Sequence, residues 1–412
     1  MPLTAAQMAA IGAPPANPTS EYRYIATDLL SGAIVGDWIP MDGTYGLNFA
    51  RQVNGTGTLT GALSLTAGNV AEQVAWRASI ANRRTVLWVL LDSVPIWNGI
   101  LWDWQPQSIL DGTMPYTAST FDSLFAYRVI QDDLTFTGMD VFDVFRSLAT
   151  YALTKDINTG AAGLNLGNSE SGISTTVTFA GSDMQLVSDA WANMVAEFGF
   201  EYAFRPGFDQ NGNLATFLDL GYPELGLQFP QSGLAYSMPG NLLDYQWTAT
   251  GSTSSNKVIA TATDNSGSGT TWTSQYPAGY DLTDLGLGNP LLEQAVSVTT
   301  ISVTGQAQIN AYATGYLPAV TGTQLTPTLW LGNGQGPAVS DIILGSWCQL
   351  ALTSPLHPAG PNGEPGFQGQ ARIVGWTLYP PTDQQAEYTW LNCWIPVPYL
   401  PDVAYSATSG TD

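Results

Sequence analysis

Apolar positions between Glu21 and Trp104 either alternate with polar ones or form short runs bounded by turn residues. Alternation is typical of a half-buried strand, and a short apolar run is typical of a fully buried one. Asn54-Gly55 and Asp92-Ser93 fall between such segments and predict tight turns. We therefore expect this part of the chain to form a sheet.

The stretch VPIWNGILWDW, residues 94–104, is apolar at odd and even positions alike. Strict alternation would place Trp102 and Trp104 together on one face, and Trp97 with Gly99 on the other. A strand that is apolar on both faces lies between two layers. Trp97, Trp102 and Trp104 are therefore predicted core or interface residues. We expect Trp102 and Trp104 to pack against the helical region that follows or against a second subunit. Gly99 would leave room for a backbone or ring to approach closely.

The apolar period changes to a helical one after Met114. Apolar residues recur three and four positions apart in segments 119–128 and 139–153. They do so again before Gly199, which is expected to end a helix that begins with a capping box at Ser182 and Gln185.

Strand patterns return at residue 200. The hairpin there is expected to pair Tyr202 with Leu220 and Phe204 with Leu218, around a three-residue loop that ends at Gly212. A further helix is expected from a stripe formed by Ile309, Tyr312, Tyr316 and Leu317.

The predicted fold class is α+β and mostly β. Two long strands joined by a polar loop are expected near the C-terminus, within residues 371–397. The predicted divisions are an N-terminal extension (1–19), a first β domain (20–113), an α+β domain (114–230), a second β domain with one helix (231–337), a C-terminal β domain (338–400) and an unstructured tail (401–412).

Composition narrows the classes of function. The 412 residues are 44% hydrophobic, which argues against disorder, and only 11% charged, which suits extensive buried subunit contacts. The 33 acids outnumber the 11 bases, giving a formal charge of −22. A protein that grips nucleic acid needs clustered lysine and arginine, so DNA binding is excluded. No apolar stretch is long enough to span a membrane, so no membrane anchor is expected, and the first residues do not resemble a secretory signal.

Candidate catalytic residues are few. The single histidine, His357, lies in the loop-like stretch PLHPAG and is predicted to be solvent-exposed. Cys348 and Cys393 are predicted to be small buried side chains, with a disulfide as the alternative. No nucleotide-binding or nucleophile motif is present.

Two carboxylate pairs could serve a glycoside hydrolase, namely Asp103 with Asp111 and Glu197 with Glu201. Any acidic chain of this length offers such pairs, and nothing singles out either one. We therefore predict no enzyme activity, no cofactor and no metal.

The order of several motifs carries a more specific signal. ARQVNGTGTLTGALSL precedes RRTVLWVLLDSVPIWNGILWDWQP, and the helical stretches FDSLFAYRVI and GMDVFDVFRSLATYAL follow. The hairpin FGFEYAFRPGFDQNGNLATFLDLGYPELG, then SSNKVIATA, INAYATGYL and GQARIVGWTLYP complete the set. This order resembles the minor tail protein, or tail hub, family of long-tailed phages of actinobacterial hosts, which is related to the baseplate hub proteins of contractile tails.

The resemblance implies β-barrel-like tail hub domains with an intervening helical α+β region. It implies a structural virion protein at the distal end of the tail, assembled in the host cytoplasm as a homotrimeric ring. The family has two similar domains per subunit, for which segments 20–110 and 230–345 are candidates. Expected partners are the distal tail protein, the tape measure protein and other minor tail proteins.

The acidic composition suits a ring through which DNA passes without specific binding. Such a ring should have an acidic or neutral lumen, with arginines such as Arg51, Arg83 and Arg128 turned to subunit contacts. The alternative function is a minor tail protein that binds a host receptor or cell-wall glycan through exposed aromatic rings.

Overall fold

The computed structural model describes residues 20–42, 46–66, 68–105, 112–251, 255–263, 271–276, 291–298, 306–320, 324–332, 334, 336–382 and 386–395. The predicted N-terminal extension (1–19) and tail (401–412) lie outside these ranges. Among the described residues the fold is α+β and mostly β, as the sequence predicts. Its sheets are open, and no closed barrel forms within these ranges.

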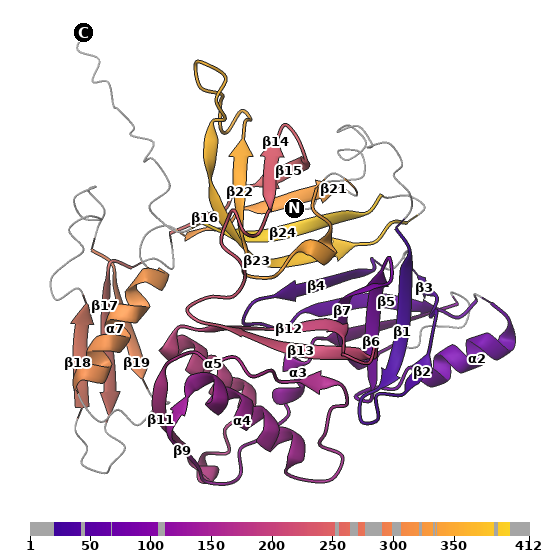
Figure 1. Ribbon diagram of the computed structural model, residues 1–412, viewed down its shortest axis with the longest axis horizontal. Coiled ribbons are helices and arrows are strands. Elements are labelled where there is room, and N and C mark those ends of the chain that lie inside the picture. Colours follow the sequence, from indigo (N-terminus) through magenta and orange to yellow (C-terminus); the bar gives the residue numbers. More distant parts are fainter. Residues whose placement is uncertain are drawn as a thin grey trace.

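The first part of the chain forms the predicted strands (Figure 1). They are β1 (Tyr22–Asp28), β2 (Ile34–Gly36), β3 (Met41–Asp42), β4 (Asn48–Gln52), β5 (Thr58–Ser64), β6 (Thr85–Leu91), β7 (Val94–Trp104) and β8 (Thr113–Ser119). Every residue of β6 is buried. Asp92 and Ser93 have φ values of 50° and 69°, which suit the tight turn predicted between β6 and β7.

The last part of the chain extends the same sheet. Its strands are β14 (Ala235–Met238), β15 (Leu242–Gln246), β21 (Thr328–Gly332), β22 (Trp347–Leu352), β23 (Phe367–Tyr379) and β24 (Tyr388–Trp394). β23 and β24 are the two long strands predicted there. The strand order is β15-β21-β24-β23-β4-β5-β8-β7-β6-β1-β2, with β3 beside β5 and with β22 between β14 and β23. The pairing of β23 with β4 therefore joins the strands of the first part of the chain to those of the last part.

A small lobe is inserted between β15 and β21. It contains β17 (Lys257–Thr263), β18 (Thr271–Tyr276), β19 (Glu293–Val298) and α7 (Gln306–Val320). Ile309, Tyr312 and Tyr316 of the predicted stripe pack on this sheet. The chain enters and leaves the lobe through the paired strands β16 (Ala249–Thr250) and β20 (Gln324–Leu325).

The middle of the chain forms the α+β region that lies below the large sheet in Figure 1. It contains α3 (Asp122–Phe125), β9 (Leu134–Asp140), α4 (Val141–Thr154), β10 (Leu164–Asn165), β11 (Ser174–Phe179), a 3₁₀ turn η2 (Gly181–Asp183), α5 (Val187–Phe198), β12 (Glu201–Phe208) and β13 (Leu214–Gly221). The hairpin β12–β13 has the predicted register, with Tyr202 opposite Leu220 and Phe204 opposite Leu218. Gly212 has the positive φ, 80°, that the loop requires.

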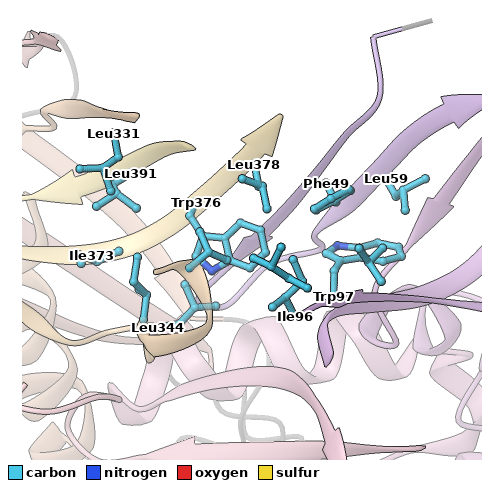
Figure 2. Packing of buried hydrophobic residues seen from close by; sticks show 14 of the residues in the cluster. Phe49, Leu59, Ile96, Trp97, Leu331, Leu344, Ile373, Trp376, Leu378 and Leu391 are labelled. Carbon is cyan, nitrogen blue, oxygen red and sulfur yellow. The ribbon is translucent and has the colours of Figure 1, made fainter. Parts of the chain in front are cut away.

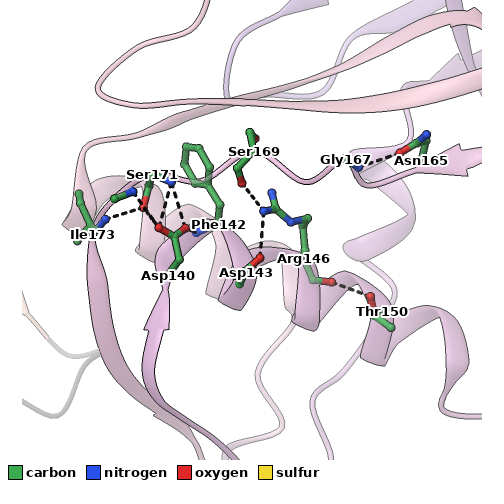
Figure 3. A network of polar contacts seen from close by, with 11 residues as sticks. Asp140, Phe142, Asp143, Arg146, Thr150, Asn165, Gly167, Ser169, Ser171 and Ile173 are labelled. Carbon is green, nitrogen blue, oxygen red and sulfur yellow. Dashed lines mark hydrogen bonds and ion pairs between the residues drawn. The ribbon is translucent and has the colours of Figure 1, made fainter.

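Helix α4 begins where its sequence allows a strong N-cap. Asp140 accepts hydrogen bonds from Phe142 N at 2.8 Å and from Gly172 N at 2.9 Å (Figure 3). Burial raises the pKa of Asp140, but hydrogen bonds from Ser171, Phe142 and Gly172 outweigh that effect and hold it below its ordinary value. One carboxylate thus starts the helix and fixes the loop before β11.

Two helix predictions need correction. α5 does not begin at Ser182, because Met184 is left-handed and Ile130 N donates to Gln185 O at 2.8 Å. That bridge holds the chain extended until Val187, so no capping box forms there. α2 (Val70–Ser79) lies in the segment predicted to be only strands, and a capping box between Asn69 and Glu72 starts it.

The core of the large sheet is continuous across the β4–β23 pairing. Trp97 lies under Phe49 of β4, while Trp376 and Leu378 of β23 lie on the other side of Ile96 (Figure 2). Cys348 and Cys393 belong to this core as buried free thiols, as the sequence predicts. A hydrogen bond with Cys348, together with burial, raises the pKa of the Cys393 thiol.

Candidate functional site: a two-sided strand and the junctions beside it

Strand β7 lies between two hydrophobic clusters. Trp97 and Leu101 belong to the core of the large sheet, and Ile100 belongs to the core of the α+β region. Trp97 is fully buried, and its ring N–H donates to Ala50 O at 2.8 Å. The strand is therefore apolar on both faces because it is covered on both faces, as the sequence predicts.

Trp102 and Trp104 do not share a face, contrary to strict alternation. Trp102 packs against the α+β region, where its ring N–H donates to Ser123 Oγ at 2.9 Å and its ring lies 4.6 Å from that of Tyr127. Trp104 packs instead against the core of the large sheet. A shift in the β7–β8 register between Leu101 and Asp103 separates the two rings, because a bulge changes which face later residues occupy. Both side chains are partly buried.

Gly99 permits the close approach that the sequence predicts. A Cβ atom at this position would lie 2.4 Å from Ser119 O and 2.5 Å from the ring of Trp97. The backbone of β8 and the buried indole therefore both occupy space that any larger residue would need.

Polar groups attach β7 and its neighbours to the hairpin β12–β13. Asn98 is 1% exposed and donates to Thr216 Oγ1 at 2.6 Å. Asn54, in the turn after β4, exchanges hydrogen bonds with the backbone of Tyr202 at 2.8 and 3.0 Å. These bonds fix the hairpin in one position on the sheet.

We call the packed rings of Phe125, Phe145, Trp191, Tyr202 and Phe204 the aromatic junction, because they join helices α3, α4 and α5 to the hairpin. The Phe145 and Trp191 rings are stacked with centroids 4.1 Å apart, and the Phe125 ring lies 4.3 Å from Trp191. Trp191 also donates its ring N–H to Phe145 O at 3.2 Å.

We call the cluster of the buried Arg372 with the partly buried Glu201 and Glu224 the ionic junction, because it joins the hairpin to β23. Arg372 donates to Glu201 Oε1 at 2.6 Å and pairs with Glu224 Oε2 at 3.3 Å. Its Nε also donates to Gly345 O at 2.9 Å, so all three guanidinium nitrogens of Arg372 donate hydrogen bonds. Trp347 adds a hydrogen bond to Glu224 at 2.9 Å.

The four candidate carboxylates have different environments. Glu201 is held by Arg372, and burial raises the pKa of Glu197 to about 8. Among the described residues no group hydrogen-bonds to Glu197 Oε2. Asp103 is exposed on β7, and Asp111 lies outside the described residues.

His357 is half-buried, which corrects the prediction of a solvent-exposed residue. Its Nδ1 lies 2.8 Å from the hydroxyl of Tyr245, and its ring packs edge-on against Trp247 at 4.9 Å. Burial lowers the pKa of this histidine. The half-buried aromatic environment of His357 could not be predicted from the sequence, because Trp247 lies more than one hundred residues away along the chain.

The three arginines considered for a ring lumen have different environments. Arg83 is exposed, Arg128 is half-buried and Arg51 is buried. Burial lowers the pKa of Arg51 to about 10, which leaves it protonated at neutral pH. No group of three or more acidic, histidine or cysteine side chains within the described ranges could hold a metal ion. Nor does any helix within those ranges have the length and apolar character needed to cross a membrane.

No family model and no curated protein matches this sequence. Solved structures that share its fold include three tail proteins. The prophage tail protein gp18 from Listeria monocytogenes EGD-e is 12% identical, with a TM-score of 0.51 over 90% of this chain and 94% of that one. The tail protein from Neisseria meningitidis MC58 is also 12% identical, with a TM-score of 0.50 over 90% and 96% of the two chains.

The 43 kDa tail protein of prophage MuSo2 from Shewanella oneidensis is 10% identical, with a TM-score of 0.53 over 91% of this chain and 98% of that one. The chain therefore has a fold that phage tail proteins have, over nearly its whole length. The narrower resemblance to the actinobacterial family stays a prediction.

Proposed function

We propose that this chain is a structural protein of a phage tail and forms a homotrimeric hub at its distal end. The observation that carries the proposal is the shared fold, which spans at least 90% of this chain and of each of three tail proteins. The order of motifs along the sequence, independent of those structures, supports the same class of protein.

The proposed threefold ring would adapt to a hexameric tube through two similar units in each subunit. The sequence predicts segments 20–110 and 230–345 as these units. Because β14 and β21 pair with β22 and β24 of the following segment, we propose instead the two halves of the large sheet, β1–β8 and β14–β24 without the inserted lobe, which meet where β4 pairs with β23. The distal tail protein, the tape measure protein and other minor tail proteins are the proposed neighbours, in a virion assembled in the host cytoplasm.

DNA would pass through the ring without specific binding. The charge of −22 supports this role, because an acidic wall repels the phosphate backbone. We propose no enzyme activity. The candidate pairs support this view, since Glu201 is engaged with Arg372.

Electron microscopy of purified tails, with this chain labelled, tests the proposal. We expect a ring of three copies at the distal end. A sixfold ring, or a single copy in the intact tail, would contradict it. A monomer in dilute solution is compatible with it, since assembly depends on neighbouring proteins.

The competing function, binding of a host receptor or glycan, makes a different prediction for the tryptophans. Tails carrying Trp97→Ala or Trp102→Ala should fail to assemble if these rings hold the hub together. Tails that assembled normally with either variant, yet failed to attach to cells, would favour receptor binding.

A further inference from the structure

A cavity of about 640 Å³ opens beside β7. Its walls come mainly from the start of β7, the hairpin β12–β13 and the segment that includes η3 (Val339–Asp341), and Arg51 of β4 completes them. The cavity thus lies where the α+β region meets both halves of the large sheet.

The walls include an exposed apolar patch. Val94, Phe208 and Ile343 all border the cavity and are 47%, 46% and 48% exposed. A single exposed apolar side chain is ordinary, but three around one cavity form a surface that water covers poorly. Each comes from a different part of the chain, so local sequence alone does not explain the patch.

Arg51 contributes a buried positive charge to the same wall. One of its Nη atoms donates to Phe204 O at 2.9 Å. Its Nε is buried, and no described residue accepts a hydrogen bond from it. Within the described ranges no carboxylate lies within ion-pair distance of Arg51, whereas its neighbour Arg205 is paired with Asp219 at 2.7 Å.

Asp219 raises the pKa of Arg51 through its charge and the Trp376 ring lies 5.9 Å from the guanidinium, but Asp219 is itself paired with Arg205. The buried charge of Arg51 is therefore only partly compensated, and a buried N–H group without an acceptor is costly. A carboxylate has the matching shape and charge, because it can accept two parallel hydrogen bonds from an arginine. The apolar walls further favour a carboxylate carried by a segment with apolar neighbours.

We propose that a carboxylate side chain from a second copy of this chain enters the cavity and pairs with Arg51. This inference rests on the proposed function, since it needs neighbouring copies in a ring. The chain itself offers the complementary charge, with 33 acids to 11 bases. A cyclic assembly requires each copy to present both a socket and the group that fills it.

The first test compares Arg51→Met with the same change at Arg84, a paired surface arginine outside the cavity walls. Full-length protein is followed by thermal unfolding at a concentration where it is monomeric, and by assembly into tails. We expect Arg51→Met to leave the monomer as stable as the wild type or more stable, while incorporation into tails falls at least tenfold. Arg84→Met should leave incorporation unchanged.

The opposite pattern would show a purely internal role for Arg51. If Arg51→Met destabilises the monomer and incorporation falls only in proportion to the folded fraction, the inference is wrong. If wild-type tails contain the threefold ring and Arg51→Met tails contain it equally, the inference fails while the proposed function stands. If wild-type tails lack the ring, the proposed function fails.

A photo-crosslinking amino acid in place of Phe208 identifies the occupant. In assembled tails we expect a cross-linked dimer of this chain, with the bond mapped to a peptide that contains an aspartate or glutamate. Combining the probe with Arg51→Met, which cannot pair with a carboxylate, should abolish the dimer. A cross-link to a different tail protein, a cross-link only within one chain, or a dimer that persists with Arg51→Met would overturn the inference.

Discussion

The aromatic junction and the ionic junction attach the same hairpin to different parts of the molecule, the first by apolar packing and the second by charge pairing. The aromatic junction buries rings whose contacts are numerous and individually weak, and its stabilisation grows with the area removed from water. The ionic junction depends on three charged groups that compensate one another, and each is costly when its partner is absent. Loss of a ring therefore removes a share of the stabilisation, whereas loss of Arg372 leaves two neighbouring carboxylates without their cation.

The largest effect is expected for Trp191→Ala in the aromatic junction. Trp191 is 1% exposed, so truncation leaves a cavity and removes contacts with Phe125 and Phe145. We expect a loss of about 3–5 kcal/mol in the free energy of unfolding. Denaturant unfolding measures it, with Trp191→Phe as the control that keeps most of the volume. A loss below about 1 kcal/mol would contradict the description of a packed junction.

Arg372→Ala should have the next largest effect. It leaves Glu201 and Glu224 without their cation, and we expect a loss of about 3 kcal/mol. This value is at the low end for a buried pair because the side chains of Glu201 and Glu224 are 17% and 28% exposed.

The contrast sharpens when the charges are removed together. A triple variant with Arg372→Met, Glu201→Gln and Glu224→Gln should recover most of the stability lost in Arg372→Ala, because no isolated charge remains. If the triple variant is as unstable as the single one, the junction acts through hydrogen bonding or packing and not through charge.

Asn98→Ala should cost less than either junction variant, about 1–2 kcal/mol, because one buried hydrogen bond to Thr216 is lost. Thr216→Val removes the other partner at nearly constant volume. A double-mutant cycle on denaturant midpoints should give a coupling energy of at least about 0.5 kcal/mol between the two residues. Strict additivity would show that the bond does not contribute.

The smallest effect concerns pH. Burial raises the pKa of Glu197 from 4.5 to about 8, so the folded chain binds more protons than the unfolded chain between these values. Its contribution to stability therefore falls as the pH rises from about 5 to 8. The slope should lie below the limit of about 1.4 kcal/mol per pH unit, since the side chain is only half-buried.

Glu197→Gln removes this proton and should flatten the profile. Thermal unfolding from pH 5 to 8 compares it with the wild type and with Glu170→Gln, an exposed control on the same α+β region. If stability changes with pH at the same rate in the wild type and in Glu197→Gln, the pKa of Glu197 is not raised in the folded protein.

The burial of β7 on both faces could be predicted from its sequence because apolar residues occupy odd and even positions alike. The separation of Trp102 from Trp104 could not, since the bulge after Leu101 is set by how β8 pairs with β7. A period-two pattern gives the faces of a regular strand and is silent about register shifts imposed by a partner.

The unpredicted helix α2 shows the converse case. Its capping box at Asn69 and Glu72 was readable, but its apolar residues do not form an inward stripe. Val70 and Val74 are 74% and 63% exposed, and only Ser79 of the helix is buried. The pattern of apolar residues there therefore gave no sign of a helix, whereas the capping residues Asn69 and Glu72 correctly indicated one.

The junctions themselves were beyond prediction from the sequence alone. Glu201 and Arg372 are separated by 171 residues, and neither lies in a motif that announces a pairing. The hairpin register could be predicted because both strands are adjacent in the sequence. What the hairpin contacts depends on the topology that brings β23 beside β4.

The narrow attachment of the inserted lobe has an evolutionary consequence. Ala249 pairs with Leu325 and Thr250 with Gln324, so the chain leaves the large sheet and returns to it at neighbouring points. The loss of chain entropy on closing a loop between such points is only slightly larger for a long segment than for a short one. Descendants of this chain can therefore lengthen, replace or lose the lobe while the pairing of β15 with β21 is preserved, which makes it the part of the molecule most open to diversification.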